Sequence, residues 1–186
     1  MYTTRRKTSR GTREKIMGAV RELLADGRFH ESTVEEVATL AGVSRATLYQ
    51  HFGSRLGLVD ALCDTFDENP ALIAVRGTDD IAEFIALVMD FWEVEEPVLR
   101  QLYGVAAVDP AARDLVERQR RDRHGELRRL LRANGLADRR SFAALSLLTS
   151  FETYVELRRV VGLSKREVVR TLQDDATRLL HKARLR

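Results

Sequence analysis

Apolar residues recur three or four positions apart along most of the chain, and no segment shows the strict alternation of a half-buried strand. Positions with this spacing share one side of an α-helix. The first such helix is expected from about Gly11 to Ala25, with a buried side formed by Ile16, Val20, Leu23 and Leu24. The pattern predicts an all-α protein with about nine helices.

The predicted helices form two groups, separated by the segment Glu68 to Thr78, which contains Pro70 and Gly77. This segment is expected to be a linker, either irregular or with a turn of helix. First-turn prolines and capping side chains mark the expected helix starts after this linker, at Asp79, Pro97, Pro110, Asp138 and Ser164. The helix that starts at Asp138 is expected to run to about Val161. We therefore predict an N-terminal domain at residues 1–67 and a second helical domain at residues 79–186.

Residues 32–55 are the most informative segment, because they have the pattern of two short helices joined by a tight turn at Ala41-Gly42-Val43. Two capping boxes are possible for the first helix, each with a hydroxyl residue and a glutamate three positions later: Ser32 with Glu35, or Thr33 with Glu36. Gly42 can adopt the left-handed conformation that ends this helix, and Ser44 can cap the second. This arrangement is a helix-turn-helix and predicts binding to DNA.

The second helix of this motif carries a polar set that suits DNA: Arg45, Thr47, Tyr49, Gln50 and His51. It is expected to lie in the major groove and to contact base edges from its first turns. Arg45 is the best candidate for a guanine contact, because its guanidinium matches the O6 and N7 acceptors. Thr47 is expected at a thymine methyl or a phosphate, and phosphate contacts are expected for Tyr49, His51 and Arg55. The alternative is a helix pair whose polar face only meets water.

The charge distribution supports the same reading, because the whole net charge of +3 lies in the first third of the chain. Residues 1–60 carry 10 basic and 7 acidic residues, whereas the remaining 126 carry 21 of each. Basic residues are crowded at the start of the chain, which predicts a flexible basic arm at residues 1–10. Such an arm would neutralise phosphates or enter the minor groove. The alternative for the arm is an ordinary solvated tail.

Composition excludes several classes of protein. A hydrophobic content of 44% over 186 residues suffices for a sizeable core. No run approaches the roughly 20 apolar residues of a membrane span, and the N-terminus lacks the apolar stretch of a signal peptide. Cys63 is the single cysteine, so an internal disulfide is impossible. We expect a cytoplasmic protein with no membrane partner.

Catalytic groups are not placed as an enzyme would need them. The four histidines lie far apart, with no second ligand at helical spacing, at His30, His51, His124 and His181. No Gly-rich loop that would bind phosphate is present. We expect neither an enzyme nor a cofactor nor a metal site.

A series of short motifs resembles the DNA-binding domain of tetracycline-repressor (TetR) family transcriptional regulators: Thr33-Val-Glu-Glu-Val-Ala, Ala41-Gly-Val-Ser, Ala46-Thr-Leu-Tyr, His51-Phe, Ser54-Arg and Leu58-Val. The specific match covers roughly residues 10–66. The rest of the chain is similar to that family only in helical content, helix count and length. Gly57 stands where many members have a better helix former, which would loosen the fourth helix.

The resemblance implies a homodimer, usually a repressor, whose eighth and ninth helices form a dimer bundle. It also implies a cavity among helices five to eight, whose effector shifts the fourth helix and spreads the two reading heads. Carried over by motif, the residues at bases would be Arg45, Ala46 and Thr47. The residues at phosphates would be Thr33, Ser44, Tyr49, His51 and Arg55.

The apolar pattern of the last two predicted helices indicates where the chain would dimerise. The first half of the segment Phe142 to Val161 is apolar on more than one side, and the final helix has a narrow apolar stripe at near-heptad spacing. A second copy of the chain would bury both as a four-helix bundle. The expected interface residues are Leu148, Val155, Val168, Leu172, Ala176 and Leu179. The alternative is that both helices are covered within one chain.

Aromatic and aliphatic side chains of the second domain are the candidates for an effector pocket. Periodicity alone favours an ordinary core for them, whereas the resemblance favours a pocket for some. The candidates are Phe84, Val88, Trp92, Leu99, Tyr103, Phe142 and Leu145, and they predict a largely apolar effector.

Together these observations give one hypothesis and one alternative. The hypothesis is a homodimeric repressor that binds an inverted-repeat operator through its helix-turn-helix and is released by an apolar small molecule. In the alternative, the chain is a dimeric DNA-binding protein whose second domain has no effector and only dimerises or recruits a protein partner.

Overall fold

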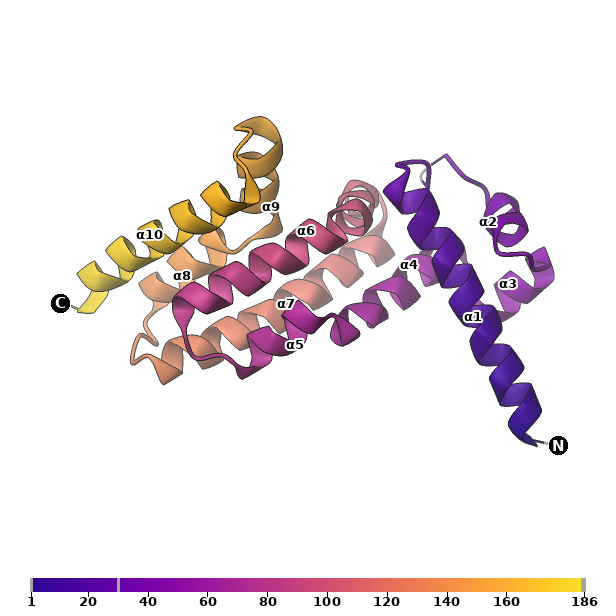
Figure 1. Ribbon diagram of the computed structural model, residues 1–186, viewed down its shortest axis with the longest axis horizontal. Coiled ribbons are helices and arrows are strands. Elements are labelled where there is room, and N and C mark those ends of the chain that lie inside the picture. Colours follow the sequence, from indigo (N-terminus) through magenta and orange to yellow (C-terminus); the bar gives the residue numbers. More distant parts are fainter. Residues whose placement is uncertain (1, 30, 185–186) are drawn as a thin grey trace. The chain divides into compact units, whose positions relative to one another are not determined.

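The computed structural model describes residues 2–29 and 31–184, and within them the side chains at 2–10, 111 and 182–184 are left undescribed. In these residues the chain forms ten α-helices, one 3-10 turn (η1) and one π-helical segment (η2), and no strand (Figure 1). The predicted all-α fold is confirmed. None of the helices in the described part is long and apolar enough to cross a membrane.

The chain divides into two compact units. The first unit comprises Met1–Phe66 and Glu96–Val116, and the second comprises Asp67–Glu95 and Glu117–Arg186. Helices α6 (Ile81–Ala106) and α7 (Pro110–Ala133) each contribute residues to both units.

The first unit begins with α1 (Tyr2–Ala25), α2 (Val34–Leu40), α3 (Arg45–Phe52) and α4 (Arg55–Asp64). Its core is formed by one apolar side of each helix, with these side chains almost fully buried: Ile16, Val20, Val37, Leu48, Leu58 and Leu62. Helix α1 starts at Tyr2 rather than near Gly11, so the backbone of the predicted arm from Tyr2 onward is helical. The arm side chains on which the minor-groove prediction depends lie outside the described residues.

The predicted linker instead contains a helix, α5 (Pro70–Gly77), which follows the 3-10 turn η1 (Thr65–Glu68). Asn69 caps this helix by accepting a hydrogen bond from the Ala71 amide, and Pro70 occupies the first turn. Both are favourable start signals, because the first turn has amides without helical partners and tolerates proline. The segment is therefore more helical than the single turn that the sequence allowed for, since α5 has 8 residues.

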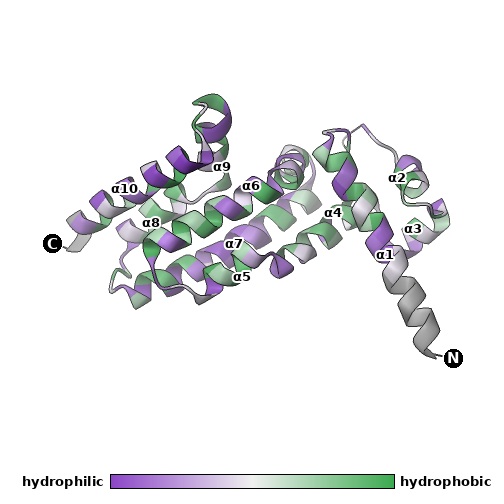
Figure 2. Ribbon diagram, viewed as in Figure 1, coloured by the Kyte–Doolittle hydropathy of each residue, from purple (hydrophilic) through white to green (hydrophobic). Residues whose placement is uncertain are grey.

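Pro97 lies inside α6 and does not start a separate helix, so that prediction was wrong. A proline in the interior of a helix removes one hydrogen bond to the preceding turn. The helix continues because a single buried side extends past Pro97 in both directions, through Phe84, Val88, Trp92, Leu99 and Leu102. This apolar side recurs once per turn along α6 in Figure 2.

The prediction of one helix from Asp138 to Val161 is also wrong. This segment is divided into α8 (Arg139–Leu148), α9 (Phe151–Val155) and the π-helical segment η2 (Glu156–Val160). Ser150 breaks the helix, since its hydroxyl accepts the Thr153 amide and caps α9. Serine competes with the helical backbone in this way. The second unit ends with α10 (Lys165–Arg184).

A hydrogen-bonded group joins α6 to the segment after α9. One carboxylate oxygen of Glu93 accepts from the Tyr154 hydroxyl at 2.7 Å and from Arg158 Nε at 3.1 Å. The other accepts from Arg158 Nη2 at 2.8 Å, and Arg158 Nη1 donates to the Leu163 carbonyl at 2.7 Å. The group therefore holds η2 and the connection to α10 against α6.

This group predicts a specific pH dependence. The hydrogen bonds from Arg158 are the main cause of a lowered pKa at Glu93, which Tyr154 also lowers. Because the folded-state pKa lies below the unfolded one, the stabilisation is present above the unfolded pKa and is lost as pH falls through the folded pKa. Glu93→Gln is expected to lower the free energy of unfolding by about 1 kcal/mol at neutral pH, a modest value because both side chains are partly exposed.

Urea unfolding followed by Trp92 fluorescence measures this effect, because Trp92 is the only tryptophan and its buried Nε1 donates to the Thr149 carbonyl in the second unit. The stability difference between wild type and Glu93→Gln is expected to shrink as pH falls. Glu152→Gln is the matched control, because Glu152 pairs with Arg120 at 2.5 Å on an exposed surface. A difference that stayed constant through the acid range would contradict the prediction.

Candidate nucleic-acid interface

The start of α2 has the capping box formed by Thr33 and Glu36. The Glu36 amide donates to Thr33 Oγ1 at 3.1 Å, and the Thr33 amide donates to Glu36 Oε2 at 2.6 Å. Ser32, the other candidate cap, is buried and donates its hydroxyl to the Phe29 carbonyl at 2.8 Å. The Thr33 side chain is therefore occupied with the helix end in the free protein, while the residue remains exposed.

The turn between α2 and α3 is made as the sequence indicates. Gly42 has a φ of 65°, a left-handed conformation that favours glycine. The Val43 amide donates to the Ala38 carbonyl at 2.9 Å, which closes the turn. Ser44 then caps α3, since its hydroxyl accepts the Thr47 amide at 3.0 Å.

Helix α3 has one buried and one exposed side. Leu48 and Phe52 are its buried residues. Among the predicted DNA-binding residues, the exposed ones are Thr33, Ser44, Arg45, Ala46, Tyr49 and Gln50, while Thr47, His51 and Arg55 are half-buried. The buried side fixes how α3 rotates about its axis, so the polar side faces solvent.

Arg45 is held by two contacts on this surface. Its Nη1 atom lies 3.8 Å from Glu35 Oε2 of α2, and its guanidinium carbon lies 5.4 Å from the centre of the Tyr49 ring. A hydrogen bond with the Tyr49 side chain is the main cause of a raised pKa at Arg45. The side chain stays charged at working pH, and an exposed pair such as Arg45–Glu35 costs little to exchange for a base or phosphate.

Arg55 is placed differently from the other candidates. Its guanidinium lies 4.4 Å from the centre of the Phe29 ring and donates to the Ser32 carbonyl, so it joins the start of α4 to the connection between α1 and α2. Burial lowers the pKa of Arg55. Because a guanidinium has five N–H groups, a phosphate contact remains compatible with these contacts. That contact stays a prediction.

The candidate effector residues are divided between the two units. Leu99 and Tyr103 belong to the first unit, whereas the others belong to the second. Five of the seven are buried, namely Phe84, Val88, Trp92, Leu99 and Leu145, while Tyr103 and Phe142 are half-buried. Trp92 packs against Phe91 and Phe151, with ring centres 5.0 and 5.5 Å away.

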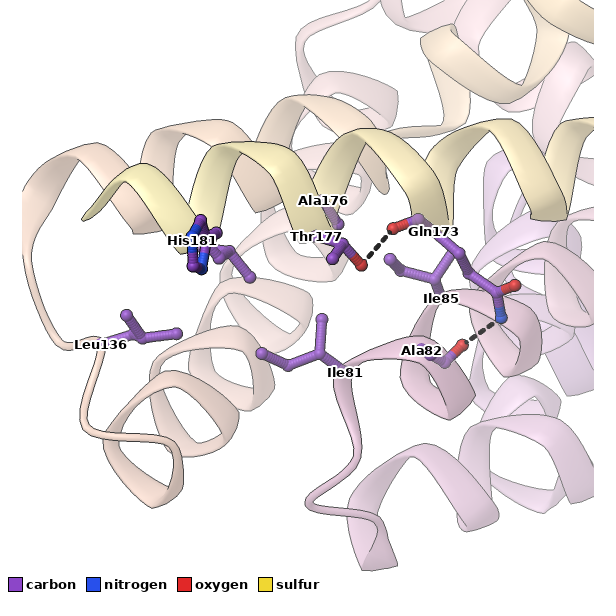
Figure 3. Close-up of a pocket in the computed structure, with 9 residues that line it drawn as sticks. Ile81, Ala82, Ile85, Leu136, Gln173, Ala176, Thr177 and His181 are labelled. Carbon is purple, nitrogen blue, oxygen red and sulfur yellow. Dashed lines mark hydrogen bonds between the residues drawn. The ribbon is translucent and has the colours of Figure 1, made fainter. Parts of the chain in front are cut away.

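One cavity of the second unit lies between the start of α6 and the end of α10 (Figure 3). It has a volume of about 210 Å³ and is lined by Ile81, Ala82, Ile85, Leu136, Gln173, Ala176, Thr177, Leu180 and His181. Gln173 Nε2 donates to the Ala82 carbonyl at 2.8 Å across the two helices. Among these residues, the sequence predicted a binding role only for Ala176, at the dimer interface. The spacing of Ile81 and Ile85 indicated a buried side but not which distant helix would face it.

The predicted dimer residues divide between covered and open positions. Val168, Leu172 and Ala176 are buried by the same chain, since α10 packs against α8. Leu148 and Val155 are half-buried, and Leu179 is 46% exposed. Other large apolar residues exposed on this group of helices are Leu147, Val160 and Val161. The apolar surface that a partner could cover therefore consists mainly of Leu179 and these three residues. Most of the predicted stripe on α10 is already buried.

The His, Cys, Asp and Glu side chains were also compared with the spacing that a metal ion needs. Among the residues that the structure describes, no group of three or more His, Cys, Asp or Glu side chains is placed to hold a metal ion. Cys63 is buried in α4.

Comparison with known proteins finds transcriptional regulators that are similar to this part of the chain. Residues 16–62 match the family model described as "Bacterial regulatory proteins, tetR family". The HTH-type transcriptional regulator AlkX of Mycobacterium tuberculosis is 32% identical over 99 residues, which are 53% of this chain and 44% of that protein. The HTH-type transcriptional activator FasR of Mycolicibacterium smegmatis is 37% identical over 57 residues, 31% of this chain and 26% of that one. The chain matches less than half the length of these relatives.

Solved structures are similar over most of the chain. A tetR-family transcriptional regulator from Streptomyces coelicolor has a TM-score of 0.71 at 18% identity and covers 92% of this chain and 81% of its own. A putative transcriptional regulator from Saccharomonospora viridis in complex with choline has a TM-score of 0.63 at 18% identity, covering 87% of this chain and 93% of its own. At these identities the likeness shows a shared fold.

Proposed function

This chain belongs to the tetR family of bacterial regulatory proteins, and from that premise we propose that it regulates transcription by binding an operator in double-stranded DNA. The observation that carries the proposal is the polar side of α3, exposed while Leu48 and Phe52 anchor the opposite side. A helix presented in this way fits the major groove, with its first turn at the base edges. Arg45, Ala46 and Thr47 occupy that turn.

Within this function we propose a homodimer that binds an inverted repeat. Two reading helices related by a two-fold axis match two half-sites of a palindromic operator. Leu147, which is 67% exposed, and Val160, which is 70% exposed, support an apolar contact between copies. Such exposed apolar groups are stabilised when a partner covers them.

We further propose that the dimer is a repressor and that an apolar small molecule, bound within the second unit, releases it from DNA. The apolar lining of the cavity between α6 and α10 supports a ligand of this kind. Candidates from the sequence in this unit are Phe84, Val88, Trp92, Phe142 and Leu145. In the competing proposal, the second unit only dimerises or recruits a protein.

Selection of binding sites from random DNA by the purified full chain tests the regulator, with the mass of the complex measured by light scattering. We expect an enriched inverted repeat bound by a dimer or by a pair of dimers. Binding that is sensitive to salt but enriches no sequence would contradict operator recognition, because nonspecific contacts depend on phosphates alone. A thermal-shift screen with apolar compounds then separates the two proposals, since a ligand of the folded state raises Tm.

A further inference from the structure

A second cavity of the second unit lies where the end of α7 meets the start of α8. It has a volume of about 440 Å³ and is lined by Arg128, Leu131, Arg132, Ala137, Asp138, Arg139 and Phe142. Three of these seven residues are arginines, all of them exposed, and the apolar ones are Leu131, Ala137 and Phe142. The lining therefore combines positive charge with an apolar surface.

Two other arginines of α7 are held in ion pairs. Arg120 pairs with Glu152 at 2.5 Å, and Arg129 pairs with Asp79 at 2.6 Å. Within the described part of the chain, no ion pair is found at Arg128, Arg132 or Arg139. Unpaired guanidinium groups that line one cavity form a site for an anion, because each offers several N–H donors and a full charge.

The one acidic residue of the lining is already occupied. Asp138 caps α8 by accepting the amides of Arg140 and Ser141 at 2.9 and 3.0 Å, and its other oxygen accepts the Ser141 hydroxyl at 2.5 Å. Its carboxylate thus faces the helix end and is not in an ion pair with the arginines. The lining retains an excess of positive charge.

The apolar part of the cavity is held in place by two contacts to Phe142. The Arg128 guanidinium carbon lies 4.5 Å from the centre of the Phe142 ring, and the His124 ring meets it edge-on at 5.2 Å. His124 is itself held by a hydrogen bond with Ser146 Oγ at 2.9 Å. Burial lowers the pKa of His124, and the charges of Arg123, Arg128 and Arg120 lower it further, consistent with a positive potential at this corner.

We propose that this cavity binds a small organic anion that carries one flat apolar group, such as an aryl phosphate or aryl carboxylate. The guanidinium groups of Arg128, Arg132 and Arg139 bind the anionic group, because planar guanidinium donors match its oxygens. The apolar group packs on Ala137 and Phe142, which are the apolar lining residues that reach the surface. This inference goes beyond the proposed function, since it concerns a charged ligand at the α7–α8 corner and does not depend on DNA binding.

Isothermal titration of the full chain in the absence of DNA tests the proposal, with phenyl phosphate as the probe and with phenol and inorganic phosphate for comparison. Phenyl phosphate is expected to bind at least roughly tenfold more tightly than either half alone, because each half keeps only part of the contacts. The variant Arg128→Gln/Arg132→Gln/Arg139→Gln is expected to lose at least roughly tenfold in affinity for phenyl phosphate.

A matched control removes the same charge elsewhere in the unit. Arg121, Arg166 and Arg170 are exposed, and Arg121→Gln/Arg166→Gln/Arg170→Gln is expected to keep the affinity of wild type. Trp92 fluorescence and circular dichroism check that both variants are folded, and Arg139→Gln alone serves if the triple variant is not. Equal losses in the two triple variants, equal binding of phenyl and inorganic phosphate, or no binding of phenyl phosphate would each overturn the proposal. None of these outcomes would affect the selection of DNA sites.

Discussion

Leu48→Ala is expected to lower the free energy of unfolding of the helix-turn-helix unit by about 2–5 kcal/mol. Leu48 is fully buried and is one of two residues that anchor α3 to the core of the first unit. Truncation removes its transfer free energy and leaves a cavity that the surrounding helices fill only in part. Because a domain is stable by only about 5–15 kcal/mol, this single change is expected to unfold α3 in a measurable fraction of molecules and to lower DNA binding in proportion to that fraction.

Hydrogen exchange of peptides from α1 to α4, combined with urea unfolding followed by circular dichroism, measures the loss in this unit. Leu40→Ala is the matched control, because Leu40 is 46% exposed at the end of the neighbouring helix α2. Its truncation is expected to change stability by within about 0.5 kcal/mol. If the two variants were equally stable, Leu48 would not anchor the reading helix as we describe.

Arg45→Ala is expected to lower the affinity for the selected operator by roughly 1–3 kcal/mol and to relax the preference at one base-pair position. Arg45 is exposed in the first turn of α3, and its contacts to Glu35 and Tyr49 orient the guanidinium without burying it. Binding to random DNA is expected to fall much less, because the phosphate contacts are predicted at other residues.

Titration of labelled operator and of scrambled DNA at a single salt concentration measures both effects. Arg28→Ala removes the same charge from an exposed residue of the same unit that lies outside α3, and it is expected to leave base preference unchanged. If Arg45→Ala lowered the affinity for operator and for scrambled DNA equally, Arg45 would not contact a base.

Much of the candidate interface could be predicted because its signals are local. The capping box of Thr33 and Glu36, the left-handed Gly42 and the cap of Ser44 on Thr47 each join residues within a few positions of one another. The apolar spacing of Leu48 and Phe52 likewise identified the buried side of α3 and, by difference, its exposed side. The sequence left the choice between Ser32 and Thr33 open, and a hydrogen bond from Ser32 to Phe29 decides it.

The helix ends of the second domain were predicted less accurately, because the local sequence there favours one outcome and the packing favours another. Pro97 looks like a helix start, yet the buried apolar side of α6 continues on both sides of it and outweighs one missing hydrogen bond. Ser150 looks like an ordinary position in a long apolar helix, yet its hydroxyl caps α9. Local propensity is a weak guide where packing favours another outcome.

The sequence by itself determined the all-helical class, the helix-turn-helix and the polar side of α3, since spacing, caps and turns act between neighbouring residues. Tertiary structure alone decided which side chains meet across long separations. Arg55 binds Ser32 and covers Phe29, α10 buries Val168 and Leu172 against α8, and the arginines of α7 and α8 line one cavity. Periodicity identifies the side of a helix that is buried, but it contains no information on which distant helix covers that side.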